Sequence, residues 1–91
     1  MAHLKANKDH LIARVRRIAG QMTAIERALD SDASCAAVLQ QVAAARGAVN
    51  GLMDEIVEDH VREHVARPGL TDDERGTGAE ELIAVIRRYA K

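Results

Sequence analysis

The sequence predicts an all-α protein of three helices, and three observations support that fold class. Apolar residues recur at the 3.5-residue spacing of packed helices over most of the first two thirds of the chain. Tyr89 is the one aromatic residue, so the apolar content is mostly Ala, Val, Leu and Ile, which suits close-packed helices better than a sandwich or a barrel. No segment shows the alternating pattern of a strand. We expect one domain, residues 1–91, that gains part of its buried core by oligomerisation.

The first helix is expected from about Ala6 to Leu29. Its apolar residues are separated by alternating steps of four and three, as in a helix that packs along one side: Leu11, Val15, Ile18, Met22, Ile25 and Leu29. Asp30, Ser31 and Asp32 interrupt this pattern. Ser31 or Asp32 is expected to cap the helix that follows, because short polar side chains accept hydrogen bonds from exposed backbone N–H groups.

The second helix is expected from Ser34 to about Ala66 and has the same periodicity. One set of its residues recurs every seven positions, and a second set does likewise: Cys35, Val42, Val49 and Ile56, then Leu39, Arg46 and Met53. Residues 43–48, in the middle of this helix, are Ala and Gly apart from Arg46. Small side chains let two helices approach closely where they cross.

The segment Arg67-Pro68-Gly69 is expected to end the second helix, because proline and glycine both disfavour its continuation. Residues 70–78 are then expected to form a polar linker, since they include two aspartates and two glycines. A third helix is expected from about Ala79 to Ala90. Its apolar residues are Leu82, Ile83, Val85, Ile86 and Tyr89.

Basic residues are concentrated near the N-terminus, although the formal net charge is only −1. Residues 1–30 contain six Lys or Arg against three acidic residues, whereas residues 31–91 contain seven against eleven. Such a patch indicates a polyanionic partner such as double-stranded DNA, although a solvated helix face has the same composition. Without a helix-turn-helix, zinc finger or aromatic platform, DNA binding would depend on phosphate contacts and duplex shape. The candidate DNA-binding residues are Lys5, Lys8, Arg14, Arg16, Arg17 and Arg46.

Four potential metal ligands, His3, Cys35, His60 and His64, are spaced so that one chain cannot easily bring them together. His60 and His64 are one turn apart on one helix face, a common way for a helix to offer two imidazoles to one ion. Cys35 lies 25 residues before His60, which is roughly 37 Å along a helix, against metal–ligand bonds of about 2 Å. If these residues share a site, Cys35 must come from a second, antiparallel subunit that crosses the first near Gly47.

His3 lies in the N-terminal segment, and removal of the initiator methionine would leave the amine of Ala2 beside it as a chelating pair for cobalt or nickel. Imidazole and thiolate ligands suit borderline or soft divalent metals and disfavour magnesium and calcium. Each ligand also has an ordinary structural explanation. An exposed histidine pair is usually only solvated, and a buried cysteine is usually a small apolar residue. His3 would then be a tail residue without a role.

The single cysteine excludes an internal disulfide framework, and an unpaired thiol fits a reducing cytoplasm. No signal peptide is evident, and no apolar run approaches the roughly 20 residues that span a bilayer, so we expect no membrane partner. The candidate ligands would saturate a metal site, and no nucleophile pair or phosphate loop accompanies them, so we expect no enzyme. A metal-storage module that does not bind DNA is a further alternative.

Residues 14–21 (RVRRIAGQ), 35–42 (CAAVLQQV) and 46–53 (RGAVNGLM) are long motifs without gaps, and residues 60–64 (HVREH) follow them. Together they resemble the CsoR/RcnR/FrmR family of bacterial transcriptional repressors. The resemblance implies antiparallel dimers, each forming a four-helix bundle, that assemble into a homotetramer as a dimer of dimers. It also implies binding to operator DNA until an effector releases the protein.

The branches of that family differ at the effector site. The nickel- and cobalt-sensing branch uses the N-terminal amine with ligands that this chain matches as His3, Cys35, His60 and His64. Copper sensors have a second cysteine where this chain has His64, so copper(I) is not expected. The formaldehyde-sensing branch keeps the cysteine and has proline where this chain has Ala2, yet the first helix looks more like that branch. The resemblance therefore implies nickel(II) or cobalt(II) as effector, zinc as a non-cognate binder and an efflux gene as target. The alternative is formaldehyde, which would use Cys35 and the Ala2 amine.

Overall fold

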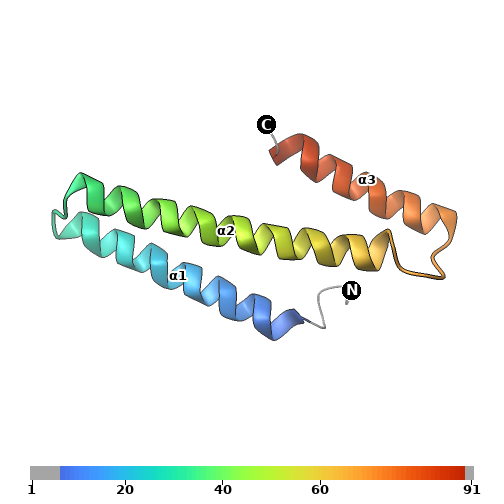
Figure 1. Cartoon of the computed structure of the whole chain (residues 1–91), viewed down its shortest axis with the longest axis horizontal. Helices are drawn as coiled ribbons and strands as arrows, with labels where there is room; N and C mark the ends of the chain where they lie inside the picture. Colours follow the sequence, from blue (N-terminus) through green and yellow to red (C-terminus); the bar gives the residue numbers. More distant parts are fainter. Residues whose placement is uncertain (1–6, 90–91) are drawn as a thin grey trace. The chain divides into compact units, whose positions relative to one another are not determined.

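The structure is a computed structural model that describes residues 7–89 (Figure 1). These residues form three helices, α1 (Lys8–Asp30), α2 (Cys35–His64) and α3 (Asp72–Tyr89), and include no strand. The predicted all-α class is therefore confirmed, and the first two helices begin and end within about two residues of the expected positions. The chain forms two compact units, residues 7–53 and the residues from Asp54 onward, so α2 contributes to both.

The first unit is an antiparallel pair formed by α1 and the first part of α2 (Figure 1). Leu11, Ile18 and Ile25 of α1 lie against α2, where Leu11 is 6% exposed and the two isoleucines are half-buried. Ala45 of α2 is 1% exposed, because its methyl side chain lets the two helices approach closely. The contact face of α2 also includes half-buried residues at steps of three and four: Val38, Gln41, Ala48 and Leu52.

Apolar side chains on another face of this unit remain exposed among residues 7–53. On α1 they are 48–62% exposed and comprise Val15, Met22 and Leu29. On α2 they are 40–62% exposed and comprise Leu39, Val42, Val49 and Met53. These seven residues are called the open apolar face below. Four residues of the predicted repeats of α2 thus lie on the open apolar face, Leu39, Val42, Val49 and Met53, and a different set of residues contacts α1.

The turn between α1 and α2 shows that the predicted cap of the second helix is wrong. Ser34, and not Ser31 or Asp32, caps α2, since its Oγ accepts a hydrogen bond from the Ala37 N–H at 3.1 Å. Ser31 instead ends α1, where its N–H donates to the carbonyl of Arg27 at 2.9 Å. Asp32 has a left-handed backbone conformation with a φ of 58°, which redirects the chain before the next helix begins.

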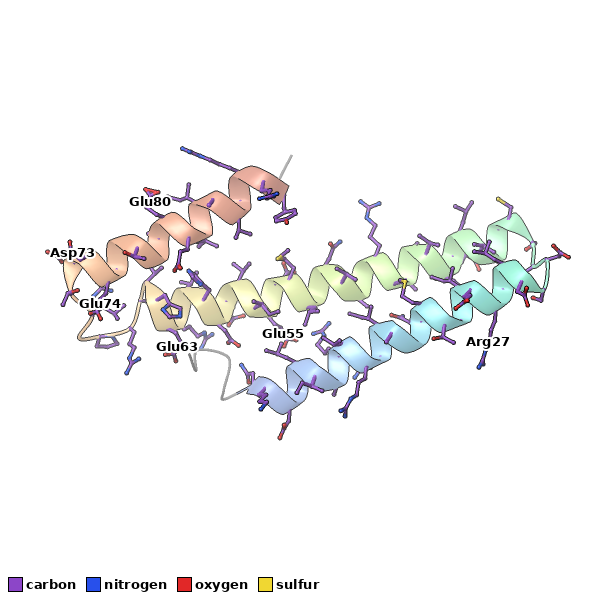
Figure 2. All side chains as sticks on the ribbon, turned by 180° about the vertical axis from the view of Figure 1, so that it is seen from behind. Arg27, Glu55, Glu63, Asp73, Glu74 and Glu80 are labelled. Carbon is purple, nitrogen blue, oxygen red and sulfur yellow. The ribbon has the colours of Figure 1, made fainter. Side chains whose placement is uncertain are left out.

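The predicted polar linker over residues 70–78 is wrong, because α3 already begins at Asp72. Thr71 and Glu74 form a capping box, in which Thr71 Oγ1 accepts the Glu74 N–H at 3.1 Å and Glu74 Oε1 accepts the Thr71 N–H at 2.8 Å. Asp73 and Glu74 lie in the first turn of α3 with Asp72, where negative charge is favourable at the positive end of the helix dipole (Figure 2). These interactions offset the low helix propensity of the two glycines in the segment.

The second unit pairs the last turns of α2 with α3, which is joined to them by residues 65–71 (Figure 1). Arg75 connects the two, since its guanidinium donates hydrogen bonds to the carbonyl of Val65 and, at 3.5 Å, to that of Leu70. Both carbonyls follow the C-terminal end of α2, where the helix dipole favours a positive charge. Among residues 7–89, none of the helices has both the length and the apolar character needed to cross a bilayer.

Candidate functional site

His60 and His64 lie one turn apart near the end of α2, and both are half-buried. Their ring centroids are 5.0 Å apart, and the ring planes are inclined by 42°. Two imidazoles at this separation can share one ion, because a zinc-type metal bonds to histidine nitrogen at about 2.0–2.1 Å. The structure therefore brings together the two predicted ligands that come from the same turn of helix.

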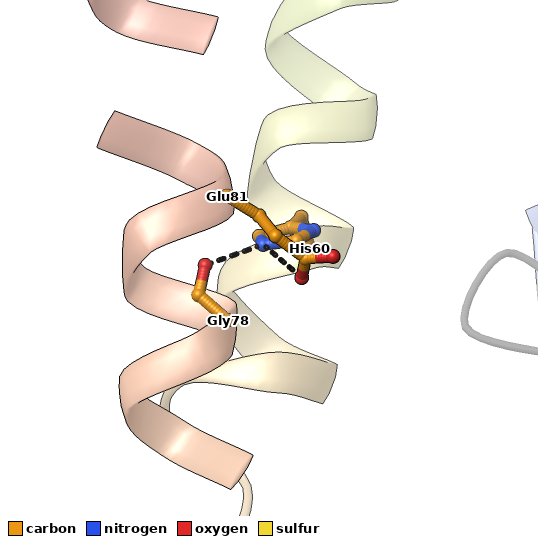
Figure 3. A network of polar contacts seen from close by, with 3 residues as sticks. All are labelled: His60, Gly78 and Glu81. Atoms are coloured by element: carbon orange, nitrogen blue, oxygen red, sulfur yellow. Dashed lines mark hydrogen bonds and ion pairs between the residues drawn. The ribbon is translucent and has the colours of Figure 1, made fainter. Parts of the chain in front are cut away.

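The ring of His60 is held by α3 (Figure 3). Its Nε2 lies 2.8 Å from the backbone carbonyl oxygen of Gly78 and 3.9 Å from Oε1 of Glu81. Because a carbonyl oxygen can only accept, Nε2 is the donor in this contact. Metal-binding histidines commonly donate their second ring N–H to a carbonyl or a carboxylate in this way.

Cys35 is an exposed free thiol at the first position of α2. Within residues 7–89 of one protomer, no three His, Cys, Asp or Glu side chains gather so that they could hold a metal ion. The described part of the chain thus does not bring Cys35 to the two histidines. The predicted ligands His3 and the Ala2 amine lie outside the described residues.

The donor types nevertheless fit a borderline divalent metal, because imidazole nitrogen and thiolate sulfur are the ligands that such metals prefer. One protomer offers two of these donors in one place, at His60 and His64. A complete site needs further ligands from the N-terminal segment or from a second protomer.

The predicted DNA-binding residues of α1 differ in exposure. Lys8, Arg16 and Arg17 are exposed, so their side chains are accessible to phosphate groups. Arg14 is half-buried, and its guanidinium lies over α2 at Gly51, where a Cβ atom would be 2.4 Å from Nη2. The absence of a side chain at Gly51 makes room for this arginine.

Two further predicted DNA-binding residues lie elsewhere. Arg46 is an exposed residue of α2. It lies one helical turn from Val42 and one from Val49, so it is on the same side of α2 as the open apolar face. Lys5 lies outside the described residues.

Sequence reasoning missed three residues of α3 that contact the last turns of α2 or the segment after it: Arg75, Gly78 and Glu81. The spacing of Thr71 and Glu74 matches the capping-box signature and would have placed all three residues in α3. Gly78 and Glu81 meet His60 across the loop between the helices, and Arg75 contacts that loop, and no local spacing in the sequence indicates such contacts.

Comparison with known proteins adds independent information. A family model described as metal-sensitive transcriptional repressor matches residues 7–88. An uncharacterized protein in the bioA 5′ region of Serratia marcescens is 53% identical over 91 residues, the full length of both chains. The transcriptional repressor RcnR of Salmonella arizonae is 42% identical, also over the full length of both. A solved structure of a glutamate-to-histidine variant of the formaldehyde-responsive regulator FrmR, from Salmonella enterica serovar Typhimurium, is 46% identical with a TM-score of 0.86, and the match covers 92% of this chain and 94% of that one.

Proposed function

This chain belongs to the family of metal-sensitive transcriptional repressors, and we propose that nickel(II) or cobalt(II) is the effector that releases it from operator DNA. The family consists of transcriptional regulators, so the chain is not an enzyme. We further propose that the effector binds between two protomers and that its binding derepresses an efflux gene.

The observation that carries this proposal is the imidazole pair of His60 and His64, with ring centroids 5.0 Å apart. The proposed ligand set adds Cys35 of a second protomer, His3 and the N-terminal amine of Ala2. Nitrogen and thiolate donors suit nickel and cobalt. Zinc would bind the same donors as a non-cognate metal, because affinity alone follows the Irving–Williams order.

An antiparallel dimer through the open apolar face would supply the missing thiolate. The seven side chains of this face are 40–62% exposed, and covering each would contribute on the order of 1 kcal/mol. Cys35 precedes Val42 by seven residues and His60 follows Met53 by seven, so both are in register with the apolar residues of α2 on this face. A protomer that covers the face in the antiparallel sense would therefore present its Cys35 to His60 of the first. Two such dimers would form the homotetramer.

Basic side chains would contact the DNA, mainly through phosphates: Lys5, Lys8, Arg14, Arg16 and Arg17, with Arg46 from α2. An oligomer repeats this set, which raises the positive charge that a small protomer offers to the duplex. When bound, the metal ion would bond to amine, imidazole and thiolate donors at one point. His3 and Ala2 precede α1 by a few residues, so their role as ligands would draw the basic start of α1 away from DNA. The ion itself adds positive charge, so release must come from this rearrangement, for which a coupling of about 1–3 kcal/mol is typical.

A formaldehyde-responsive repressor is the second candidate, and two observations favour it. The FrmR variant structure is similar over 92% of this chain, and Cys35 is an exposed thiol. In this alternative Cys35 and the Ala2 amine would react with formaldehyde, and His64 would have no part in the response.

An anaerobic cobalt(II) titration of the reduced protein, followed by ultraviolet–visible absorption, tests the metal site. We expect a thiolate-to-cobalt charge-transfer band with weak d–d bands in the wild type, and loss of the charge-transfer band in Cys35→Ala. His10→Ala is the control, because His10 is an exposed histidine of α1 outside the ligand set. A wild-type spectrum without the thiolate band would contradict the proposed ligand set.

Release from an operator fragment, measured by fluorescence anisotropy, separates the two effectors. If the protein is a metal sensor, cobalt(II) and nickel(II) release the wild type, His64→Ala loses this response, and formaldehyde has no effect on either. If it is a formaldehyde sensor, formaldehyde releases both proteins equally. Absence of DNA binding by both proteins would favour a metal-storage module.

A further inference from the structure

Arg14 lies in the contact between α1 and α2, at a position where its neighbours along the helix face are apolar. Leu11 precedes it by three residues and is 6% exposed, and Ile18 follows it by four and is half-buried. These steps place all three side chains on the face of α1 that lies against α2. A long cation fits such a position when its stem packs on the apolar surface and its charged end reaches the edge of the contact. The stem of Arg14 therefore belongs to the packing, and α2 decides where its guanidinium lies.

Gly51 of α2 provides the space that this guanidinium occupies. A Cβ atom at residue 51 would lie 2.4 Å from Nη2 of Arg14, 3.3 Å from Cζ and 3.8 Å from Nη1, and these are the nearest atoms beyond the backbone of α2 itself. Since atoms do not pack so closely, an added methyl group would displace the guanidinium. The backbones of the two helices need not shift, because the displaced atoms are the far end of a flexible side chain.

This guanidinium lies on the side of α2 that faces away from the open apolar face. Gly51 is two residues from Val49 and two from Met53, which both belong to that face. Two residues of an α-helix turn through roughly 200°, so Gly51 is on nearly the opposite side. A second protomer that covers the open apolar face would therefore leave the Arg14 guanidinium uncovered and accessible to DNA.

We propose that Gly51 is a positioning residue for DNA binding, which holds the Arg14 guanidinium in place before the duplex arrives. This inference rests on the proposed contact of Arg14 with phosphate. A flexible side chain loses conformational freedom when it binds, and that loss lowers the affinity. Packing over Gly51 removes part of this freedom in the DNA-free protein. Alanine at residue 51 would return the freedom to Arg14 without removing its charge.

Gly47 offers a matched control one turn earlier on the same side of α2. It is exposed, and nothing lies within 4 Å of the position that its Cβ would occupy. Alanine raises helix propensity at both glycines, so neither replacement weakens α2. Only at Gly51 does the added methyl group meet Arg14. A difference between Gly51→Ala and Gly47→Ala therefore reports on the displaced guanidinium.

Fluorescence anisotropy with a fluorescein-labelled DNA duplex of random sequence tests the proposal, because phosphate contacts carry no sequence information. We expect Gly51→Ala to bind about 2- to 10-fold more weakly for each Arg14 that contacts the duplex, and Gly47→Ala to bind as the wild type does. The salt slope should stay unchanged in Gly51→Ala, since no phosphate contact is removed, whereas Arg14→Ala should lower it. Once Arg14 is replaced, Gly51→Ala should cause no further loss of affinity.

Nitrogen-15 relaxation of the arginine Nε–H groups, recorded without DNA, gives a second measurement. It should show a restricted Arg14 side chain in the wild type and in Gly47→Ala, and a mobile one in Gly51→Ala. The affinity measurement would overturn the proposal if Gly51→Ala bound as the wild type does, if both glycine variants lost affinity equally, or if Gly51→Ala caused a further loss in the Arg14→Ala protein. A wild-type Arg14 as mobile as the exposed Arg17 would also overturn it. If Arg14→Ala bound DNA as tightly as the wild type, the proposed DNA-binding face itself would fail, together with this inference.

Discussion

Arg14 and Arg17 are three residues apart on α1 but have different surroundings. Arg17 is exposed, whereas Arg14 is half-buried with its guanidinium over Gly51 of α2. A side chain that is already held in place loses less conformational freedom when it contacts a phosphate. We therefore expect Arg14 to contribute more to DNA affinity than Arg17.

Replacement of either arginine by alanine should weaken binding to every DNA sequence, with the larger loss for Arg14→Ala. Phosphate contacts release counterions and carry no sequence information, so each lost contact should lower the salt slope by about one. Fluorescence anisotropy over a series of salt concentrations measures both quantities. Arg27→Ala is the control, because Arg27 lies in the last turn of α1, away from the basic residues at its start (Figure 2). Unchanged affinity in Arg14→Ala would exclude the proposed DNA-binding face.

Residues of the candidate site could be predicted where their spacing along the sequence was enough to identify them. His60 and His64 are one helical turn apart, and the basic residues are close together in the sequence, so spacing alone identifies both groups. Their partners were not predictable, because Gly78 contacts His60 across a loop and Gly51 contacts Arg14 from another helix.

At the scale of elements, the capping box of α3 should make the start of this helix sensitive to acid. Hydrogen bonds with Thr71, from its backbone first and its side chain second, hold the pKa of the Glu74 carboxyl below its usual value of 4.5. Because the pKa is lower in the folded state, the stability that this carboxylate contributes is fully present above pH 4.5 and is lost as the pH falls through the folded value. Glu74→Gln should remove this part of the pH dependence, which amide hydrogen exchange in α3 would measure.

The other half of the capping box provides a second measurement. Thr71→Ala should destabilise α3 by about 1 kcal/mol, the typical cost of a lost N-cap. Thr77→Ala is its control, since Thr77 is an exposed threonine inside the same helix. For the acid sensitivity, the same pH dependence of amide hydrogen exchange in the wild type and in Glu74→Gln would show that the carboxylate has no part in capping.

Arg75 should stabilise the contact between the end of α2 and α3. Arg75→Met keeps most of the apolar stem but removes charged hydrogen bonds to the carbonyls of Val65 and Leu70, so we expect a loss of about 1.5–3 kcal/mol in the free energy of unfolding. Arg87→Met, at an exposed position near the end of α3, should stay within about 0.5 kcal/mol of the wild type. Urea denaturation measures both variants, and equal losses would mean that the carbonyl contacts contribute nothing.

The helices differ in how well the sequence predicted them. Apolar periodicity predicted α1 and α2 because each has a long pattern of steps of three and four. The start of α3 was missed because its composition, with two glycines and several acidic residues, is typical of a loop. The start depends on two side chains, Thr71 and Glu74, whose hydrogen bonds outweigh that composition.

At the scale of the whole molecule, the sequence could not show which face of α2 packs against α1 and which face is left for a second protomer. The small residues in the middle of α2 predicted a crossing between subunits, yet Ala45 and Ala48 lie on the face that contacts α1 within the protomer. Both faces of α2 repeat at the same interval, so only the structure shows which residues remain for a partner. Those residues are the α2 members of the open apolar face.

A charge on this face should prevent the proposed dimer. Val49→Glu would place a carboxylate where the second protomer has to cover it, and an unpaired buried charge is strongly unfavourable. Ala44→Glu is the control, because Ala44 is exposed on α2 and is not part of the open apolar face. Analytical ultracentrifugation should show a smaller species for Val49→Glu only. Equal sedimentation of both variants would place the subunit contact elsewhere.

The shared metal site predicts that two inactive variants restore each other. Cys35→Ala lacks the thiolate, and the double variant His60→Ala/His64→Ala lacks the imidazole pair, so neither alone should give the cobalt charge-transfer band. In a mixed antiparallel dimer, His60 of the first variant would meet Cys35 of the second, and one of the two symmetry-related sites would be complete. Unfolding and refolding the variants together at equal amounts should restore roughly a quarter of the wild-type band, since half of the dimers are mixed and each has one complete site. If both ligands came from one chain, no band would return, and the site would not lie between subunits.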